Sequence, residues 1–306
     1  MLDRQSTIDF HIEAPSVVSL GKFDGLHSGH RYLMEEVMRG KENGLDSVVF
    51  TFDIPPASLH SDSYSVLSTN EEKLEIFEEA HIDHLIECPF NDKLRVMLPY
   101  EFLKMMTGQI NVKKIVCGTD FHFGYKRSGS YEDLLKHSSE LGYEAVIVKK
   151  KQYKGADISS TRIRKSIMEG DMEEANLLLG YDYFISEEVV HGNHLGTGMG
   201  IPTANILPPK EKLLPPAGVY AAKVRIADET FRGICDIGRK PTIEGSRPVG
   251  VEVHIFDFSR DIYGQKIKVS LLKYMRPEIK FDSMEELAAQ MQRDIRAGRL
   301  YAAEHR

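Results

Sequence analysis

The sequence predicts an α/β chain of two domains, a parallel sheet with helices on both faces followed by a small antiparallel β-barrel with a closing helix. Over residues 17–148, short apolar runs alternate with helical patterns, as they do in a parallel sheet whose crossovers are helices. From residue 183 onward, short β-type runs follow one another with little helix between them, which is typical of a small barrel. This change of pattern predicts domains at residues 1–182 and 183–306.

The elements of the first domain follow from local patterns of hydrophobicity. Its predicted strands are the apolar runs Val17–Leu20, Ser47–Phe52, His84–Glu87, Lys114–Cys117 and Ala145–Val148. Its predicted helices are Arg31–Arg39, Glu71–Ala80, Tyr100–Met106 and Glu132–Leu141. Ser68 with Glu71, and Ser130 with Asp133, have the spacing of helix N-caps.

The second domain is predicted in the same way. A helical stretch, Asp171–Leu179, precedes it. Its predicted strands are Tyr183–His191, Val219–Ala227, Phe231–Ile237, Val249–Phe258 and Lys266–Tyr274. The closing helix, Ser283–Arg296, is expected to begin with a capping box of Ser283 and Glu286 and to carry one apolar face.

Composition limits the kind of protein this is. The chain has 306 residues, of which 42% are hydrophobic, so it can bury a core in each of two domains. A net charge of −7 without a long basic run argues against nucleic acid as the main partner. The three cysteines have no paired spacing, which favours a reducing compartment. The first residues lack the pattern of a signal peptide, and no apolar run approaches the roughly 20 residues of a membrane helix.

The stretch VVSLGKFDGLHSGH, residues 17–30, carries the strongest chemical signal. It predicts a buried strand, a glycine-rich turn, and then two histidines, His27 and His30, where a helix begins. Helix-end N–H groups and imidazoles together can hold nucleotide phosphates and stabilise charge that develops on them. Two alternatives stay open on these residues alone: half of a zinc site, which the isolated cysteines make less favourable, and an ordinary strand-to-helix turn.

Two further stretches of the first half are suited to substrate binding. The loop Gly118–Gly129 combines aromatic residues, glycines and a Lys-Arg pair, which suits a flat ring that carries a phosphate; its phenylalanines could equally anchor the loop to the core. The stretch Asp157–Arg164 places three hydroxyl residues and two arginines at a helix start. Hydroxyls and arginine side chains there suit a triphosphate, whereas a simple N-cap explains only one hydroxyl.

In the second half, the densest stretch is Gly192–Asn205, with four glycines followed by Pro-Thr-Ala-Asn. It is either a flexible hairpin or a loop that wraps a phosphate. A hydroxyl and an amide two residues apart on a strand, at Thr203 and Asn205, can share a Mg²⁺ ion. Glu252 is an isolated charge within a strand whose alternation buries Val251, Val253 and Ile255, so it faces either solvent or a site.

These stretches resemble one family. GKFDGLHSGH resembles the His-x-Gly-His signature of the nucleotidyltransferase superfamily, in the form found in prokaryotic bifunctional riboflavin kinase/FMN adenylyltransferases, the FAD synthetases. GTDFHFG and ISSTRIR resemble two further motifs of that domain, and GTGMGIPTANI, GVYAAKV, VEVHIFDF and the C-terminal tail resemble the riboflavin kinase domain. The resemblance extends from about Val17 to Tyr301.

The resemblance implies a Rossmann-like nucleotidyltransferase domain and a riboflavin kinase barrel. ATP would phosphorylate riboflavin to FMN in the barrel, and FMN would react with a second ATP in the first domain to give FAD and pyrophosphate, with Mg²⁺ at both sites. The implied catalytic residues are His27, His30 and Glu252. The implied ATP ligands of the adenylyltransferase are Gly21, Phe23, Asp24, Gly25, His27, His30, Ser159, Ser160, Thr161 and Arg164. Those for FMN are Asp120, Phe121, Phe123, Lys126 and Arg127. Those for ATP in the kinase are Gly192, Gly196, Gly198, Gly200, Thr203 and Asn205, with Thr203 and Asn205 also on Mg²⁺.

Two positions depart from the family pattern: His122 stands where Arg is usual, and Asp236 where Asn is more common. Three alternatives therefore stay open: only one activity is retained, the chain is a flavin-sensing regulator without turnover, or it is related to aminoacyl-tRNA synthetases, which also carry His-x-Gly-His. We further expect small-molecule substrates, no nucleic-acid or membrane partner, a monomer or weak homo-oligomer, and a cytoplasmic location.

Overall fold

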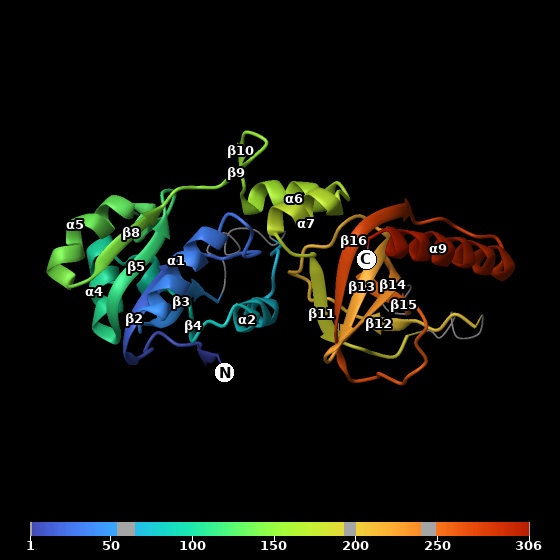
Figure 1. Cartoon of the computed structure of the whole chain (residues 1–306), viewed down its shortest axis with the longest axis horizontal. Coiled ribbons are helices and arrows are strands. Elements are labelled where there is room, and N and C mark those ends of the chain that lie inside the picture. The colour runs from blue at the N-terminus through green and yellow to red at the C-terminus, as the bar shows by residue number, and fades with distance from the viewer. Residues whose placement is uncertain (1, 54–64, 193–199, 240–248, 306) are drawn as a thin grey trace. The chain divides into compact units, whose positions relative to one another are not determined.

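The parallel sheet predicted for the first half is present in the computed structural model, which describes residues 2–53, 65–192, 200–239 and 249–305 (Figure 1). The chain divides into two compact units, Met1–Ser160 and Thr161–Arg306. The predicted domain boundary between residues 182 and 183 stays a prediction.

The first unit has six parallel strands in the order β1-β4-β3-β2-β5-β8. The strands are β1 (Asp3–Gln5), β2 (Ile12–Leu20), β3 (Asp46–Phe52), β4 (His84–Cys88), β5 (Ile110–Gly118) and β8 (Glu144–Val148). The helices are α1 (Arg31–Glu42), α2 (Asn70–Glu79), α3 (Asp92–Arg95), α4 (Pro99–Gln109) and α5 (Tyr131–Leu141). The short elements are β6 (His122–Phe123), η2 (Tyr125–Arg127), β7 (Gly129–Ser130), β9 (Gln152–Tyr153) and β10 (Ala156–Asp157). All five predicted strands and all four predicted helices of this half are present.

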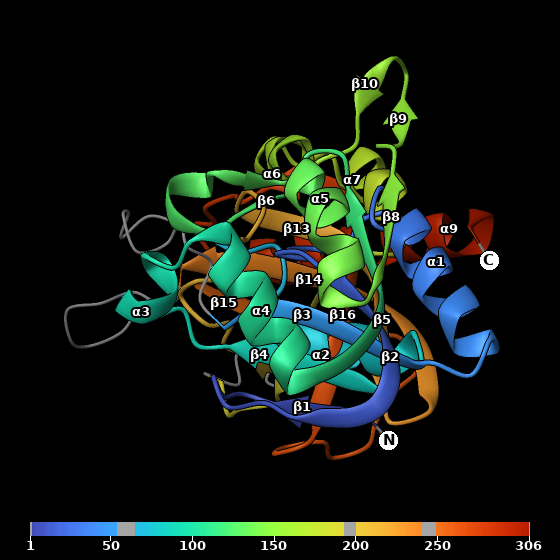
Figure 2. The ribbon, with the colours of Figure 1, turned by 90° about the vertical axis from the view of Figure 1, so that its left-hand side faces the viewer.

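Helices cover both faces of this sheet (Figure 2). Successive residues of β2 point to opposite faces, and Val17 and Val18 accordingly belong to different cores. Val17 packs with residues of α1 and α2 such as Val37 and Phe77, and Val18 packs with residues of α4 and α5 such as Leu103 and Leu134. The sheet is therefore buried on both sides, and its open ligand-binding edge lies beyond the carboxyl ends of its strands.

One predicted helix start is wrong by a residue. The N-cap of α2 is Thr69, which accepts from Glu72 N, whereas the sequence analysis paired Ser68 with Glu71. Ser68 and Thr69 are adjacent, and both residue types are favoured at an N-cap. The local sequence therefore does not distinguish them. The capping box of Ser130 with Asp133 is confirmed.

The second unit is a nearly closed antiparallel barrel with strand order β11-β16-β13-β14-β15-β12. Its elements are α6 (Ser160–Met168), α7 (Met172–Leu179), β11 (Phe184–Glu188), β12 (Ala204–Ile206), β13 (Gly218–Ile226), β14 (Glu229–Arg239), β15 (Val249–Ile255), β16 (Lys266–Pro277) and α9 (Met284–Glu304). A bridge between Val190, just beyond β11, and Asn205 of β12 joins the two outermost strands. Asn205 thereby lies at the seam where the barrel closes.

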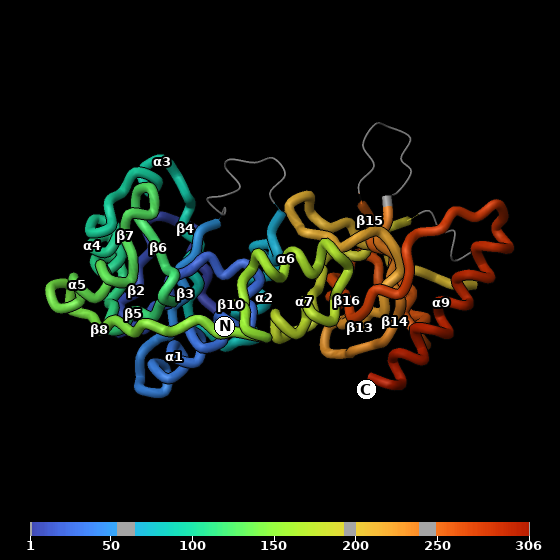
Figure 3. Tube along the Cα trace, turned by 90° about the horizontal axis from the view of Figure 1, so that it is seen from above, coloured from blue at the N-terminus to red at the C-terminus, as the bar shows by residue number. Residues whose placement is uncertain are grey.

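The closing helix α9 lies along β13 and β14 (Figure 3). Its Ile295 packs with Val219, Ile234 and Phe256 of the barrel. The helix runs to Glu304, beyond the predicted end at Arg296. The predicted capping box is half present, because the Ser283 side chain accepts from Glu286 N while the Glu286 carboxylate accepts from Asp282 N. Among the described residues, no helix has the length and apolar character needed to cross a membrane.

Candidate active sites

The glycine-rich turn follows β2 directly at the open edge of the sheet. A side chain at Gly21 would meet the Phe23 ring at 2.9 Å, and Phe23 (φ 45°) and Gly25 (φ 81°) both adopt left-handed backbone conformations. The carboxylate of Asp24 accepts from Leu67 N at 2.8 Å and from Ser68 N at 3.3 Å. The Asp24 side chain thus serves to hold the turn against the segment that leads into α2.

His27 and His30 lie together at the start of α1, as the sequence predicts. Their rings are stacked, with centroids 3.8 Å apart and planes 14° from parallel, and the Phe23 ring meets His30 edge-on at 5.3 Å. The Nδ1 atoms of both histidines are buried and have no hydrogen-bond partner among the described residues. Buried polar atoms are rarely left unpaired, so a structural role within the turn does not account for these two nitrogens.

Burial also decides the charge of the two imidazoles. Loss of hydration lowers the pKa of His27 to about 4. It lowers the pKa of His30 well below the ordinary value, and the nearby His27 adds to this effect. Both rings are therefore neutral at pH 7, and each can offer an N–H dipole but no net positive charge.

The predicted FMN residues lie after β5, at the same edge of the sheet. The rings of Phe121 and Phe123 are stacked with centroids 5.3 Å apart, and both pack against the core between the sheet and α4, so they anchor the loop. Asp120 forms an ion pair with Lys150 at 3.0 Å. Lys126 and Arg127 are exposed. Their possible contact with FMN stays a prediction.

A hydrogen bond from Ser160 to Asp24 joins the predicted triphosphate stretch to the histidine turn. Ser160 begins α6, and its hydroxyl donates to Asp24 O at 2.9 Å. Ser159 lies directly before it. Thr161 and Arg164 belong to the second unit, and their position against the histidines stays a prediction. Arg162 is bound to Glu174 of α7 at 2.6 Å, which explains this arginine without a phosphate.

In the barrel, register brings the predicted kinase residues into one row. Asn205 of β12 lies opposite Glu252 of β15, and Glu252 lies opposite Asp236 of β14. Directly opposed residues on antiparallel strands point to the same face. The predicted metal ligand Asn205, the predicted base Glu252 and the unusual Asp236 therefore share one face of the sheet.

Burial along β15 confirms the predicted alternation, with Val251, Val253 and Ile255 buried. Glu252 is half-buried, so it is not a fully solvated surface charge. Solvent reaches Asp236, yet the surrounding protein removes part of its hydration, and together with the carboxylates of Glu278 and Glu252 this raises the pKa of Asp236 to about 6.

The glycine-rich kinase loop is described only at its two ends. Gly196 and Gly198 lie outside the described residues. At Gly192, a Cβ would lie 2.4 to 2.6 Å from the Asn205 side chain, so any larger residue there would displace Asn205. Gly200 has φ of +72° and an open surrounding. Thr203 directly precedes β12, and its carbonyl oxygen lies 3.5 Å from Asn205 Nδ2.

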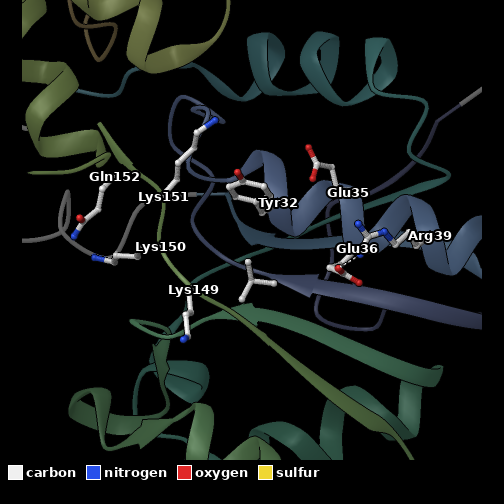
Figure 4. A pocket seen from close by; sticks show the side chains of 9 residues that line it. Tyr32, Glu35, Glu36, Arg39, Lys149, Lys150, Lys151 and Gln152 are labelled. Carbon is white, nitrogen blue, oxygen red and sulfur yellow. Dashed lines mark hydrogen bonds and ion pairs between the residues drawn. The ribbon is translucent and has the colours of Figure 1, made fainter. Parts of the chain in front are cut away.

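Sequence reasoning missed a basic pocket between α1 and the residues that follow β8. The pocket has a volume of about 580 Å³. It is lined by Tyr32, Glu35, Glu36, Arg39, Val148, Lys149, Lys150, Lys151 and Gln152 (Figure 4). The run of three lysines after β8 is visible in the sequence, but lysine runs are usually solvated. Only the structure shows that this run lies beside α1 and lines a pocket.

Comparison with known proteins finds two family models on this chain. An FAD synthetase model matches residues 9–162, and a riboflavin kinase model matches residues 179–302. A bifunctional riboflavin kinase/FMN adenylyltransferase of Listeria monocytogenes is 35% identical over 97% of this chain and 96% of its own. Its counterpart in Bacillus subtilis is 34% identical over 92% of this chain and 91% of its own. The chain belongs to the bifunctional riboflavin kinase/FMN adenylyltransferase family.

The fold of nearly the whole chain also matches a solved structure. A solved structure from Streptococcus pneumoniae, described as a macrolide-efflux protein, superimposes with a TM-score of 0.86 at 31% identity and covers 97% of this chain and 98% of that one. The relative from Escherichia coli K12 is 34% identical over 91% of this chain and 90% of its own. The predicted resemblance and both predicted domain folds are thus confirmed.

Proposed function

We propose that this chain makes FAD from riboflavin in two ATP-dependent steps: the barrel phosphorylates riboflavin to FMN, and the parallel-sheet unit transfers an adenylyl group from ATP to FMN. The observation that carries the proposal is the pair of buried, unpartnered histidines at the open edge of the sheet, in a chain that also holds Asn205 and Glu252 in one cross-strand row. We assign the two activities to residues 1–182 and 183–306.

In adenylyl transfer, a phosphate oxygen of FMN attacks the α-phosphorus of ATP, and pyrophosphate leaves. His27 and His30 are proposed to donate N–H hydrogen bonds to phosphate oxygens as negative charge develops on them, which is the role of preorganised donors in phosphoryl chemistry. The bond from Ser160 to Asp24 O links the triphosphate stretch to the glycine turn. The remaining proposed ligands of ATP are Gly21, Phe23, Asp24, Gly25, Ser159, Thr161 and Arg164, and those of FMN are Asp120, Phe121, Phe123, Lys126 and Arg127.

In the kinase step, the ribityl 5′-hydroxyl of riboflavin attacks the γ-phosphorus of ATP, and ADP leaves. Glu252 is proposed to accept the hydroxyl proton, as a general base must do while the new O–P bond forms. The proposed ATP ligands are Gly192, Gly196, Gly198, Gly200, Thr203 and Asn205.

The kinase site fits a Mg²⁺ ion through the chemistry of its donors. Thr203 and Asn205 offer hydroxyl and amide oxygens, which are hard ligands suited to Mg²⁺. No group of three or more His, Cys, Asp or Glu side chains in the described ranges could hold a metal, which fits an ion held by one or two protein oxygens together with substrate phosphates. When bound, Mg²⁺ supplies charge neutralisation to the phosphates.

We also propose a cytoplasmic location and a monomeric or weakly associating chain with small-molecule substrates and no nucleic-acid partner. The location is supported by Cys88, Cys117 and Cys235, which are all free thiols.

The test incubates the purified chain with riboflavin, ATP and Mg²⁺, under air and again with a reductant, and separates the flavins over time. FMN first and FAD second is the expected result. FMN that accumulates without FAD in either condition would mean that only the kinase is retained, and FAD from added FMN without any riboflavin turnover would mean that only the adenylyltransferase is. No turnover of either flavin, with flavin binding preserved, would favour a sensor.

A further inference from the structure

The adenylyltransferase site lacks positive charge at its histidines. A triphosphate and the FMN phosphate are strongly anionic, whereas both imidazoles are neutral at pH 7 because burial lowers their pKa values. Within the part of the first unit that the structure describes, the charged side chains that act electrostatically on His27 are Asp120 and Lys150. Lys150 is thus a cation whose charge acts on His27.

The position of Lys150 places it among the predicted substrate segments. It follows β8, and its Nζ lies 3.0 Å from an Asp120 oxygen and 3.7 Å from an Asp157 oxygen. Asp120 is the first of the predicted FMN residues, and Asp157 comes directly before the Ile-Ser-Ser-Thr stretch. One ammonium group thus lies between segments assigned to FMN and to ATP.

The Lys150 ammonium is open to a ligand. Its side chain is 35% exposed and lines the pocket of about 580 Å³ beside Tyr32 (Figure 4). The partner carboxylates are exposed as well, by 60% at Asp120 and 45% at Asp157. Exposed ion pairs contribute little to stability, so an incoming phosphate can replace a carboxylate on this ammonium at small cost.

The neighbouring lysines are placed differently. The ammonium of Lys151 lies over the Tyr32 ring, 5.3 Å from its centroid. Lys149 lines the same pocket. Of the three consecutive lysines, Lys150 is the one whose ammonium pairs with both Asp120 and Asp157.

We propose that Lys150 is a substrate-binding residue of adenylyl transfer, whose ammonium binds phosphate oxygens of ATP and of the pyrophosphate that leaves. The proposal rests on the proposed adenylyltransferase function. On binding, the ammonium exchanges Asp120 or Asp157 for a phosphate oxygen and stays protonated, so it forms hydrogen bonds and breaks no covalent bond. In that position its positive charge offsets the negative charge that the leaving group gains.

A structural role is the competing explanation, in which Lys150 only ties the Asp120 loop to the β9–β10 hairpin. The two explanations predict weaker binding of different substrates. Loss of a phosphate ligand weakens the binding of ATP and pyrophosphate, whereas a displaced Asp120 loop weakens the binding of FMN and FAD.

The experiment uses the full chain and runs adenylyl transfer backwards, from FAD and pyrophosphate to FMN and ATP, because the kinase does not use pyrophosphate. Lys150→Met is compared with Lys150→Arg, which keeps the charge, and with Lys149→Met, which removes the same charge from the adjacent residue. Riboflavin kinase activity reports whether the second unit of each variant is folded, and the thermal melting curve compared with that of the unaltered chain reports whether the first unit is.

Lys150→Met is expected to raise the KM for pyrophosphate roughly tenfold to a hundredfold, as for loss of a charged hydrogen bond, and to leave the KM for FAD within about twofold. Lys150→Arg should retain most of the affinity, and Lys149→Met should lower it much less than Lys150→Met does. An unchanged KM for pyrophosphate in Lys150→Met, or a rise confined to FAD, would overturn the proposal. Absence of the reaction in the unaltered chain would instead overturn the proposed adenylyltransferase function.

Discussion

The imidazoles of His27 and His30 stack on one another with ring centroids 3.8 Å apart, and the Nδ1 atom of each is buried without a partner among the described residues. Protonation of both stacked rings would cost much free energy, because the two positive charges repel each other and burial removes their hydration. The pair is thus a rigid, neutral set of hydrogen-bonding groups at the head of α1. This arrangement determines several consequences of substitution.

Replacement of His30 by Ala is expected to slow adenylyl transfer a hundredfold or more. It removes a preorganised donor to the transferring phosphate, and loss of one such donor costs roughly 3 kcal/mol of transition-state stabilisation. The measurement is the rate of FAD formation from FMN and ATP. FMN formation from riboflavin should persist in the same preparation, and its loss in a folded variant would contradict the assignment of two separate sites.

Stability should fall as the pH falls from about 6.5 toward 4. The pKa of His27 is lowered to about 4 in the folded chain, so between these values the unfolded chain binds protons that the folded chain does not. The stability that the neutral rings provide is therefore fully present above the unfolded pKa and is lost toward acid. Melting temperatures between pH 7.5 and pH 4.5 test this. His30→Phe, which keeps a ring at this position, should show a shallower decline, and an equal decline would argue against a contribution from His30.

Gly29→Ala should impair adenylyl transfer selectively. A Cβ at Gly29 would lie 2.9 Å from Nδ1 of His27 and 3.3 Å from the carbonyl oxygen of Ile158, so the His27 ring must shift. The rate should fall at least tenfold, because small displacements of catalytic groups are costly. Gly108→Ala is the matched control, since a Cβ there meets nothing within 4 Å. Equal activity of the two variants would show that His27 does not need its present position.

Glu252→Gln should abolish riboflavin phosphorylation while FMN adenylylation continues. The amide has nearly the shape of the carboxylate but cannot accept the hydroxyl proton, and general base catalysis typically contributes a hundredfold to ten-thousandfold. The measurement is FMN formed per unit time from riboflavin and ATP. Glu229→Gln removes the same charge from an exposed pair with Arg260 and should leave the rate unchanged. Kinase activity that survives in Glu252→Gln would exclude Glu252 as the base.

Much of this protein follows from local sequence. Every strand and helix predicted for the first half from alternating apolar and helical patterns is present, because backbone periodicity and burial on both sheet faces are visible in the order of residues; β1 and α3 were not predicted. His27, His30, Asn205 and Glu252 were identified from motif chemistry and from the family resemblance. Local sequence does not distinguish two adjacent hydroxyl residues, and only the structure shows that Thr69, and not Ser68, caps α2.

The sequence by itself determined the order of elements, the family and the residue types at each site. Only the tertiary structure decided which of those groups carry charge and which segments meet. Burial makes both histidines neutral, strand register puts Asp236 opposite Glu252, and the Asp120 loop and the β9–β10 hairpin meet at Lys150. Desolvation and Coulomb interactions depend on distances between residues far apart in the chain, and no local pattern encodes those distances.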